Sequence, residues 1–503
     1  MLATVGDIPA FAGARFGART ALVTGGREFS FADIDLLTGA LAHSLVRLGV
    51  TPGDRVTLYA PNSWEWIVSY YGALRAGAII NPINVMLTPT EVAYVTRDCG
   101  AKALIGSPDK IAAVTEAGVE GLTTVAFGSP SVAGAHSFDE LLSNPRPFET
   151  IRVDPSVAST IGYTSGTTGH PKGAVQSHRA VMINVAMTAQ MHLKTERDVV
   201  VTALPCPHVY GNVVFQGALM CGAKLVLHPR FDAAEILASV QAHRATLLEA
   251  VPTMYMYMLA SRDLAGRDLS SLTRCTVGGQ TMPAAKMREV EERFGCPLIE
   301  LWGMTELAGL GTTFPVYGPH KLGSIGIALP YCEARIADAA DAGKTAPRGE
   351  VGELMMRGPI VMQGYWNNEQ ATREAIEPDG WLHTGDLASM DEDGAIFIVD
   401  RKKDMINTSG YKVFPAEIER VIAAHPSVAM VAVGGAPDEI KGEIAIAYVV
   451  LKPAAAADEE GVLALCRREL SAYKVPRRVR YVDDLPKTST GKIMRRELWK
   501  LGA

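Results

Sequence analysis

Short apolar segments alternate with helix-like segments through the first part of the chain. Residues 55–60 (RVTLYA) precede a predicted helix over 63–76, and residues 224–228 (KLVLH) precede a predicted helix over 233–244. This alternation is typical of β-α-β units, in which helices cover a parallel sheet. Because the pattern occurs in two separate stretches, the sequence predicts two stacked α/β subdomains.

The pattern changes near residue 333. Strand-like segments separated by turns indicate a small antiparallel region there: EARIAD (333–338), VGELMMRG (351–358) and AIFIVD (395–400). Beyond Asp400, two predicted helices, near 415–424 and 460–471, flank two predicted strands. This unit of about 100 residues has the size of an independent α+β domain. The chain therefore divides near residue 400.

Composition and charge exclude several classes of protein. Of the 503 residues, 48% are hydrophobic and 20% are charged, which suffices for large cores. A net charge of −6 without a long run of Lys or Arg argues against nucleic-acid binding. Seven cysteines without a C-x-x-C pair argue against a disulfide framework and against a structural zinc site.

The sequence carries no recognisable targeting or membrane segment. Residues 1–20 lack the basic-then-apolar order of a signal peptide. The most apolar region, residues 67–87, is interrupted by Arg75, Pro82 and two asparagines, so it does not predict a membrane span. We therefore expect a cytoplasmic protein without a transmembrane segment.

Residues 163–173 (YTSGTTGHPKG) combine glycines and hydroxyls with a single lysine. Glycines let backbone N–H groups approach an anion, and a lysine adds a positive charge, so the segment favours phosphate binding. It does not fit the pattern G-x-x-x-x-G-K-[ST], because Pro171 replaces the second glycine and Gly173 follows Lys172. A flexible surface loop is the alternative for this segment taken alone.

Four other polar segments strengthen the case for a nucleotide site: LWGMTE (301–306), HTGDL (383–387), DRKKD (400–404) and LPKTSTGKIMRREL (485–498). Trp302 is suited to stack on a base, and Glu306 to bind Mg²⁺. Asp386 is suited to accept hydrogen bonds from ribose hydroxyls, and Lys492 to offset a developing negative charge. Each residue alone is more typical of an ordinary core, turn or solvated position. Only their combination favours a site.

These motifs, in this order, resemble those of the adenylate-forming superfamily, which includes acyl-CoA synthetases, firefly luciferase and the adenylation domains of peptide synthetases. The matching motifs are YTSGTTGHPKG, WGMTE, GWLHTGD, DRKKDMINTSGYKVFPAEIE and LPKTSTGKIMRREL, which span nearly the whole chain. The resemblance implies a large N-terminal adenylation domain over residues 1–400 and a hinge at 401–403. It also implies a small mobile C-terminal domain over 404–503 that carries the catalytic lysine.

The resemblance also implies a reaction in two steps. A carboxylate first attacks the α-phosphate of MgATP, which gives an acyl-adenylate and pyrophosphate. The C-terminal domain then rotates, and a thiol such as that of coenzyme A displaces AMP. The enzyme mainly positions the reacting groups and stabilises phosphoryl charge. The co-substrates expected from the resemblance are ATP with Mg²⁺, coenzyme A and a small carboxylic acid.

Site residues are carried over from the family one by one. The phosphate loop is matched by Thr164, Ser165, Gly166, Thr167, Thr168, Gly169 and Lys172. The segment beside the adenine is matched by Gly278, Gly279 and Gln280, and the stacking position by Trp302, followed by Gly303. The α-phosphate and metal contacts are matched by Thr305 and Glu306, the ribose contacts by Asp386 and Arg401, and the catalytic lysine by Lys492. The hinge is matched by Lys403, the pantetheine tunnel by Gly410 and Tyr411, and the mouth of the acyl pocket by His208.

The sequence departs from the family at two positions. The family usually has tyrosine where this chain has Trp302, and a larger indole is expected to narrow the adjacent acyl pocket. Many members have asparagine where this chain has Ala180, a change expected to matter only locally.

Four segments are expected from the resemblance to line the acyl pocket: 205–217, 251–258, 277–280 and 302–311. They contain no Lys or Arg, and a second substrate carboxylate would need a buried partner. We therefore expect a CoA ligase for a neutral, largely apolar monocarboxylic acid, aliphatic or aromatic. A carrier-loading or luciferase-like adenylating enzyme, a malonate-type dicarboxylate ligase and a nucleotide-binding protein without turnover are the alternatives. Homodimerisation stays open.

Overall fold

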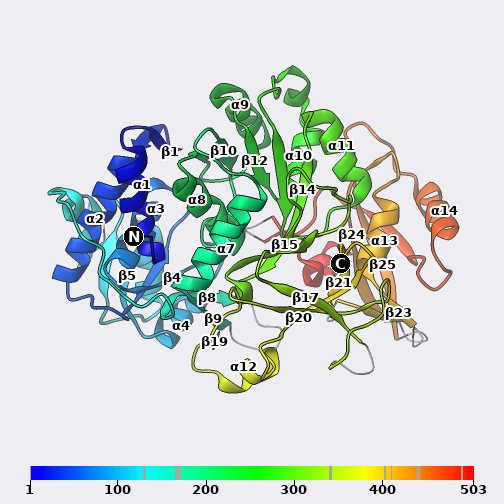
Figure 1. Ribbon diagram of the computed structural model, residues 1–503. Coiled ribbons are helices and arrows are strands. Elements are labelled where there is room, and N and C mark those ends of the chain that lie inside the picture. Colours follow the sequence, from blue (N-terminus) through cyan, green and yellow to red (C-terminus); the bar gives the residue numbers. More distant parts are fainter. Residues whose placement is uncertain are drawn as a thin grey trace.

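Four β-sheets, with helices packed on their faces, organise the described part of this computed structural model (Figure 1). The structure describes residues 2–128, 132–164, 171–338, 343–401, 404–408, 411–438, 442–488 and 491–502. Two large sheets lie in the N-terminal part, a small antiparallel sheet follows, and the fourth sheet lies in the C-terminal part. The predicted fold class, with a large α/β N-terminal part and a small α+β C-terminal part, is confirmed.

The first large sheet has the strand order β19-β9-β8-β4-β3-β5-β6-β7. Its centre is parallel, as the alternating pattern predicts, because β3 (Arg55–Tyr59) pairs in parallel with β4 (Ile79–Pro82) and β5 (Ala101–Gly106). Strand β9 (Lys172–Ser177) runs antiparallel to β8 (Ala158–Thr164). The other strands are β6 (Thr123–Ala126), β7 (His136–Ser137) and β19 (Gly364–Tyr365).

The second large sheet has the order β16-β15-β14-β13-β12-β10-β11-β1-β2. Its parallel strands β12 (Leu247–Ala250), β13 (Arg274–Gly278) and β14 (Leu298–Met304) end at the same edge. Ligands of open α/β sheets bind outside the carboxyl ends of such strands. The other strands are β1 (Thr20–Thr24), β2 (Arg27–Ser30), β10 (Val199–Thr202), β11 (Lys224–Leu227), β15 (Gly309–Thr313) and β16 (Ile327–Ala328).

Buried helices join the two large sheets into one core. Helix α3 (Trp64–Arg75) begins after Ser63, whose side chain accepts a hydrogen bond from the backbone N–H of Trp66. The rings of Trp66 and Tyr70 pack edge-on against Phe215 of α8 (Val209–Cys221), with centroids 5.6 and 5.3 Å away. The other helices of this part are α1 (Ile8–Phe16), α2 (Phe31–Arg47), α4 (Pro89–Asp98), α5 (Pro108–Glu116), α6 (Phe138–Leu142), α7 (His178–Met191), α9 (Ala233–His243), α10 (Pro252–Ala260), α11 (Ala284–Phe294) and α12 (Glu369–Ala375).

The most apolar region of the sequence, residues 67–87, is used for this packing. It forms most of α3 and the fully buried strand β4. Within the described ranges, none of the helices is long and apolar enough to cross a lipid bilayer.

The predicted antiparallel region is also present. It consists of β17 (Glu333–Ala337), β18 (Gly352–Arg357), β20 (Leu382–Met390) and β21 (Ile396–Arg401), in that order. The register between β20 and β21 places Asp386 opposite Arg401. Two residues that are distant in sequence, and that were both assigned to the ribose, are therefore neighbours.

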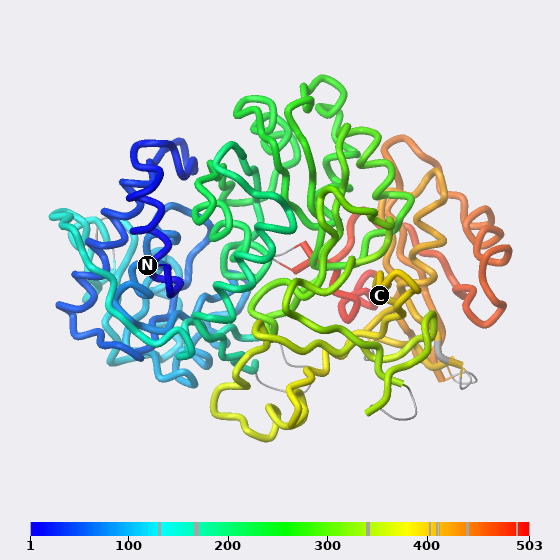
Figure 2. Tube along the Cα trace, in the orientation of Figure 1, coloured from blue at the N-terminus to red at the C-terminus, as the bar shows by residue number. Residues whose placement is uncertain are grey.

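The C-terminal part has its own sheet and core. The sheet contains β22 (Ile406–Thr408), β23 (Tyr411–Val413), β24 (Val428–Asp438), β25 (Gly442–Leu451) and β26 (Arg478–Tyr481). The α-helices are α13 (Pro415–Ile422) and α14 (Glu459–Glu469), and a 3-10 helix, η4, follows over Arg495–Gly502. The change of sheet from β21 to β22 falls across the predicted hinge at 401–403, of which residues 402 and 403 lie outside the described residues. The red end of the chain folds back toward the green and yellow segments in Figure 2.

Candidate active site

Lys492 of the C-terminal part reaches the end of strand β13 in the N-terminal part. A Cβ atom added to Gly279 would lie 3.1 Å from Cε of Lys492 and 3.4 Å from Cγ1 of Val251. Gly279 also has a φ of 93°, which L-residues rarely adopt. The glycine thus leaves the space that the lysine stem occupies. Next to it, the side-chain amide of Gln280 donates a 3.5 Å hydrogen bond to the carbonyl of Ile493.

Asp386 lies between Trp302 and Arg401. The indole Nε1 of Trp302 donates a 2.7 Å hydrogen bond to Oδ2 of Asp386, and Nε of Arg401 lies 3.4 Å from Oδ1. Burial raises the pKa of the Asp386 carboxyl, while Arg401 and the indole N–H oppose that rise. Trp302 and Arg401 therefore replace part of the hydration that the Asp386 carboxylate loses on burial. The bond from Trp302 is a contact that the sequence did not predict.

Glu306 is buried and held by a tyrosine. The hydroxyl of Tyr365 donates a 2.8 Å hydrogen bond to Oε1 of Glu306, and the backbone N–H of Met362 donates to the Glu306 carbonyl at 2.8 Å. Burial is the main cause that raises the pKa of the Glu306 carboxyl, and the hydrogen bond from Tyr365 opposes it. Nothing in the sequence around GYW (364–366) singled out Tyr365.

Two further side chains fix the turn that carries Thr305 and Glu306. The amide of Gln176 donates a 2.9 Å hydrogen bond to the carbonyl of Thr305. Asn184 of α7 is fully buried and donates to the carbonyls of Leu307 and Leu310, at 3.0 and 2.7 Å. Its Oδ1 accepts from the Leu310 backbone N–H at 3.1 Å. Sequence reasoning missed both residues, because their amides act on backbone atoms more than a hundred residues away.

The donor set at Glu306 fits a cation that arrives with a nucleotide. Among the residues that the structure describes, no three His, Cys, Asp or Glu side chains form a metal-binding group. Mg²⁺ in phosphate sites commonly takes one or two carboxylate oxygens and completes its shell with phosphate oxygens and water. Glu306 supplies one such carboxylate, so it suits Mg²⁺ bound to ATP better than a resident metal ion.

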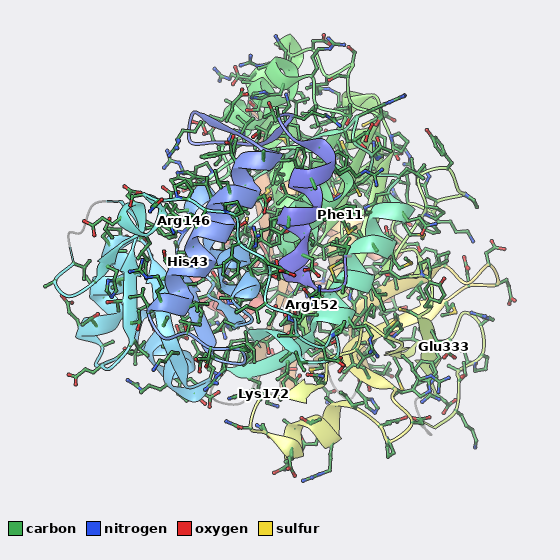
Figure 3. The ribbon with its side chains drawn as sticks, turned by 60° about the vertical axis from the view of Figure 1, so that its left-hand side comes forward. Phe11, His43, Arg146, Arg152, Lys172 and Glu333 are labelled. Carbon is green, nitrogen blue, oxygen red and sulfur yellow. The ribbon has the colours of Figure 1, made fainter. Side chains whose placement is uncertain are left out.

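The ends of the predicted phosphate loop are close to Glu306. Thr164 and Lys172 are paired across β8 and β9. The ammonium of Lys172 lies 5.3 Å from the ring centroid of Tyr365, within the range of a cation–π interaction. Tyr365 therefore contacts both a cation and a carboxylate of the predicted site. Figure 3 shows Lys172 beside the yellow segment that contains β19 and α12. Residues Ser165, Gly166, Thr167, Thr168 and Gly169 lie outside the described residues.

Both His208 and Lys492 are partly buried, and the charge of Lys492 acts on His208. Burial lowers the pKa of His208 well below its usual value, and the charge of Lys492 lowers it further. Burial, and then Arg401, lower the pKa of Lys492 to about 8, against the opposing effect of Asp386. His208 also caps α8, because its Nδ1 accepts from the backbone N–H of Tyr210 at 3.4 Å. Together with Thr305 it borders a cavity whose lining also includes Asn84, Thr160 and Asn212.

The remaining predicted residues lie as follows. Gly278 ends β13, and Gly303 lies in β14 opposite Leu310. Tyr411 is 57% exposed and stacks on Tyr473, with ring centroids 4.7 Å apart. Its assignment to a pantetheine tunnel after domain rotation stays a prediction. Lys403 and Gly410 lie outside the described residues.

The expectation that residues 251–258 line the acyl pocket is wrong for Met256 and Tyr257. These two side chains pack against apolar residues of the C-terminal part. Tyr255 and Met258 are fully buried in the core of the N-terminal part. Helix α10 is apolar on both faces, and the sequence alone did not show that one face contacts another domain.

Comparison with known families agrees with this arrangement. Residues 10–366 match the model of the AMP-binding enzyme family, and residues 417–492 match the model of the AMP-binding enzyme C-terminal domain. The chain belongs to the AMP-binding enzyme family. The two matched segments contain all the predicted site residues except Asp386, Arg401, Lys403, Gly410 and Tyr411.

Relatives of this AMP-binding enzyme are similar over nearly their whole length. The chain is 35% identical to a long-chain-fatty-acid–CoA ligase of Bacillus subtilis (strain 168), with 96% of this chain and 92% of the relative covered. An anthranilate CoA ligase, solved in complex with anthranoyl-AMP, is 29% identical with a TM-score of 0.92, over 99% of this chain and 97% of the other. An o-succinylbenzoate coenzyme A synthetase from Bacillus subtilis, solved with ATP and magnesium ion, is 28% identical with a TM-score of 0.82, over 98% and 99%.

We predict that Trp302→Phe weakens AMP binding by this family member about 10- to 100-fold, because a hydrogen bond to a charged group contributes about 1.5–3 kcal/mol. Phenylalanine keeps an aromatic ring but removes the N–H that holds Asp386. Isothermal titration with AMP measures the dissociation constant. Trp64→Phe is the control, since Trp64 packs between Phe29 and Phe138. Equal affinities of wild type and Trp302→Phe would show that the indole N–H does not support nucleotide binding.

Proposed function

We propose that this chain is an AMP-forming acyl-CoA synthetase that activates a neutral, largely apolar monocarboxylic acid. One observation carries the proposal: the stem of Lys492, from the C-terminal part, packs against Gly279 at the carboxyl end of β13, close enough to Asp386 and His208 for its charge to act on both. Three residues with complementary roles therefore lie together: Asp386 for the ribose of the nucleotide, His208 for the acid, and Lys492 for the negative charge that develops during the reaction. The similarity to CoA ligases over nearly the full length supports the same activity.

In the first step, the substrate carboxylate attacks the α-phosphorus of MgATP. One oxygen–phosphorus bond forms, the bond to the pyrophosphate oxygen breaks, and acyl-AMP and pyrophosphate result. Lys492 offsets the negative charge that accumulates between the carboxylate and the α-phosphate. With MgATP bound, Thr305 and Glu306 would contact the α-phosphate and Mg²⁺, Lys172 and the phosphate loop would contact the outer phosphates, and Asp386 with Arg401 would orient the ribose.

In the second step, the thiol sulfur of coenzyme A attacks the acyl carbon. The carbon–oxygen bond to AMP breaks, and the thiol proton is released with AMP. By family resemblance, the C-terminal domain turns about the hinge at 401–403 between the steps. Lys492 then leaves the site, and Gly410 and Tyr411 line the pantetheine tunnel.

The charges near the predicted acyl pocket favour a neutral acid. Lys194 comes from outside the four predicted lining segments, yet its ammonium lies 3.5 Å from a Cβ built on Gly217. Glu249 pairs with this ammonium at 2.9 Å, and both side chains are 1% exposed. A carboxylate of the protein therefore already neutralises the lysine, so a second substrate carboxylate would lack a free partner.

The floor of the acyl pocket is proposed to lie at Trp302 and Gly311. A Cβ built on Gly311 would lie 2.7 Å from Cζ3 of Trp302, so the indole covers this glycine. At Gly309, the corresponding space is taken by Oδ1 of Asn184, at 2.4 Å. A tryptophan at this position leaves less space than tyrosine would, which favours acids of limited length or flat aromatic acids.

Lys492→Ala tests the assignment of the two steps. Loss of one preorganised charge donor should slow acyl-adenylate formation by about 10²–10³-fold. Thioester formation from supplied acyl-adenylate and CoA should change much less. Pyrophosphate release with acid and MgATP measures the first step, and thioester yield measures the second. Equal losses in both steps would contradict the role. Wild-type pyrophosphate release without any thioester on adding CoA would indicate a carrier-loading enzyme instead.

The lowered pKa of Lys492 predicts a pH dependence. A lysine with a lowered pKa loses its proton earlier as the pH rises, so kcat/KM for MgATP in the first step should fall as the pH passes about 8. Lys492→Arg should shift this fall to higher pH, because arginine stays protonated. Pyrophosphate release in the absence of CoA avoids interference from the CoA thiol. If the alkaline limb does not move in Lys492→Arg, another group causes it.

A panel of acids identifies the substrate class. Each buried methylene should add about 0.8 kcal/mol of binding until the pocket is full, so kcat/KM should rise with chain length or ring size and then fall. Malonate and succinate should react far more slowly than the best neutral acid, because their second carboxylate would be desolvated without a partner. The measurement is steady-state kinetics at saturating MgATP and CoA. A dicarboxylate as the best substrate would overturn the proposed substrate class but not the CoA-ligase activity.

A further inference from the structure

Helix α10 presents different side chains to the two parts of the molecule. On its inner face, the hydroxyl of Tyr255 donates to the carbonyls of Leu248 and Thr276, at 3.1 and 2.9 Å. On its outer face, Met256 and Tyr257 pack against an apolar cluster of the C-terminal part that consists of Met430, Ala432, Ile446, Tyr448, Leu485 and Leu498. The inner face fixes the helix in the N-terminal core, so the outer face is a rigid surface against which the C-terminal part rests.

Tyr257 also joins a polar cluster with Asp484 and Lys487. Its hydroxyl donates a 2.7 Å hydrogen bond to Oδ1 of Asp484 and accepts one from Nζ of Lys487 at 2.6 Å. The Lys487 ammonium lies 5.0 Å from the Tyr257 ring centroid and is also paired with Asp484. Burial and the bond to Asp484 raise the pKa of the Tyr257 hydroxyl, so it stays protonated and can act as the donor.

The polar cluster lies directly before the loop that carries Lys492. Lys487 pairs with Ile493 in an antiparallel bridge. Within this bridge, the backbone N–H of Thr488 donates to the Lys492 carbonyl at 2.7 Å, and the Lys492 N–H donates to Oγ1 of Thr488 at 3.1 Å. A change in the position of Lys487 would therefore move the backbone of Lys492.

A second contact comes from Thr253, which lies one turn before Tyr257 on the same outer face of α10. Its hydroxyl donates a 2.8 Å hydrogen bond to the carbonyl of Gly491. Helix α10 thus contacts the segment before Lys492 at two residues: Tyr257 contacts Lys487, and Thr253 contacts Gly491, next to Lys492. Both are made by side chains of one helix, so they form and break together when the C-terminal part turns.

We propose that Tyr257 is a positioning residue which, with Asp484 and Lys487, holds the C-terminal domain in the orientation that places Lys492 in the adenylation site. The inference rests on the proposed function, because it requires two steps that need different orientations. This cluster, called the latch below, stabilises the orientation that the first step needs. Its contacts must break before the thiol can enter. Tyr257 contacts none of the reacting groups and acts through the bridge that joins Lys487 and Thr488 to Lys492 and Ile493.

Tyr257→Phe is the sharpest test, because it removes one hydroxyl and keeps the ring in the apolar cluster. In single-turnover experiments with MgATP and acid but no CoA, acyl-adenylate formation should slow about 5- to 20-fold, the low end of the scale for hydrogen bonds to charged groups, because the Asp484 side chain is 55% exposed. Thioester formation from supplied acyl-adenylate and CoA should stay equal to wild type or become faster. Tyr317→Phe is the matched control, since Tyr317 is 91% exposed, and both steps should be unchanged.

A double-mutant cycle separates the latch from a general loss of stability. Lys487→Met should slow the first step, and Tyr257→Phe combined with Lys487→Met should be little worse than the more affected single variant, because both act through one cluster. Lys487→Met also keeps the proposal testable if Tyr257→Phe does not fold. Additive losses would show that the two residues act independently and would overturn the latch.

The results distinguish failure of the latch from failure of the proposed function. If wild type forms both acyl-adenylate and thioester but Tyr257→Phe slows neither step, or slows both equally, the latch is wrong and the CoA-ligase activity stands. If wild type forms no acyl-adenylate with any acid, the proposed function is wrong, and the latch falls with it. A loss confined to the first step supports both.

Discussion

The burial of the Lys492 ammonium against Gly279 is the constraint on which the rest of the site depends. Removing water from an ammonium is costly unless anions or hydrogen bonds replace it. Asp386 stabilises the charge, while Arg401 opposes it and keeps the balance positive. A site with Lys492, Arg401 and Lys172 around two buried carboxylates is incomplete without a polyanion. The same groups therefore suit a nucleoside triphosphate, whose phosphates would offset these cations.

The sequence predicted the layers of the fold but not how the strands connect within them. Apolar segments identified β3 and β11 almost to the residue, because a buried parallel strand leaves a local signal. The placement of β1 and β2 beside β11, and of β19 beside β9, left no such signal. Strand partners far apart in sequence are chosen by packing of the whole domain, which no local pattern records.

The candidate site shows the same division. The motifs and the family resemblance pointed to Lys492, Glu306, Trp302 and Asp386, and the structure brings these residues close together. Tyr365 and Asn184, which hold Glu306 and the turn that follows it, were missed because a lone tyrosine or asparagine has no diagnostic spacing. The wrong expectation for Met256 and Tyr257 of α10 has a related cause. Methionine and tyrosine suit a substrate pocket and a domain interface equally well, and hydrophobic periodicity does not distinguish the two environments.

One glycine from each part lies at the interface between the N-terminal and C-terminal parts, and these two glycines limit which substitutions the interface can accept. Gly279 accommodates the lysine stem, and a Cβ on Gly491 would lie 2.7 Å from Oγ1 of Thr253; both glycines have positive φ, at 93° and 75°. Neither position can accept a side chain unless the partner surface recedes, and neither surface recedes without moving Lys492. The packing between the two parts therefore leaves no space for one additional methyl group at either glycine. A C-terminal part grafted from a relative would therefore need glycine at the position of Gly491, and glycine opposite it at the position of Gly279, to place Lys492 in the same way.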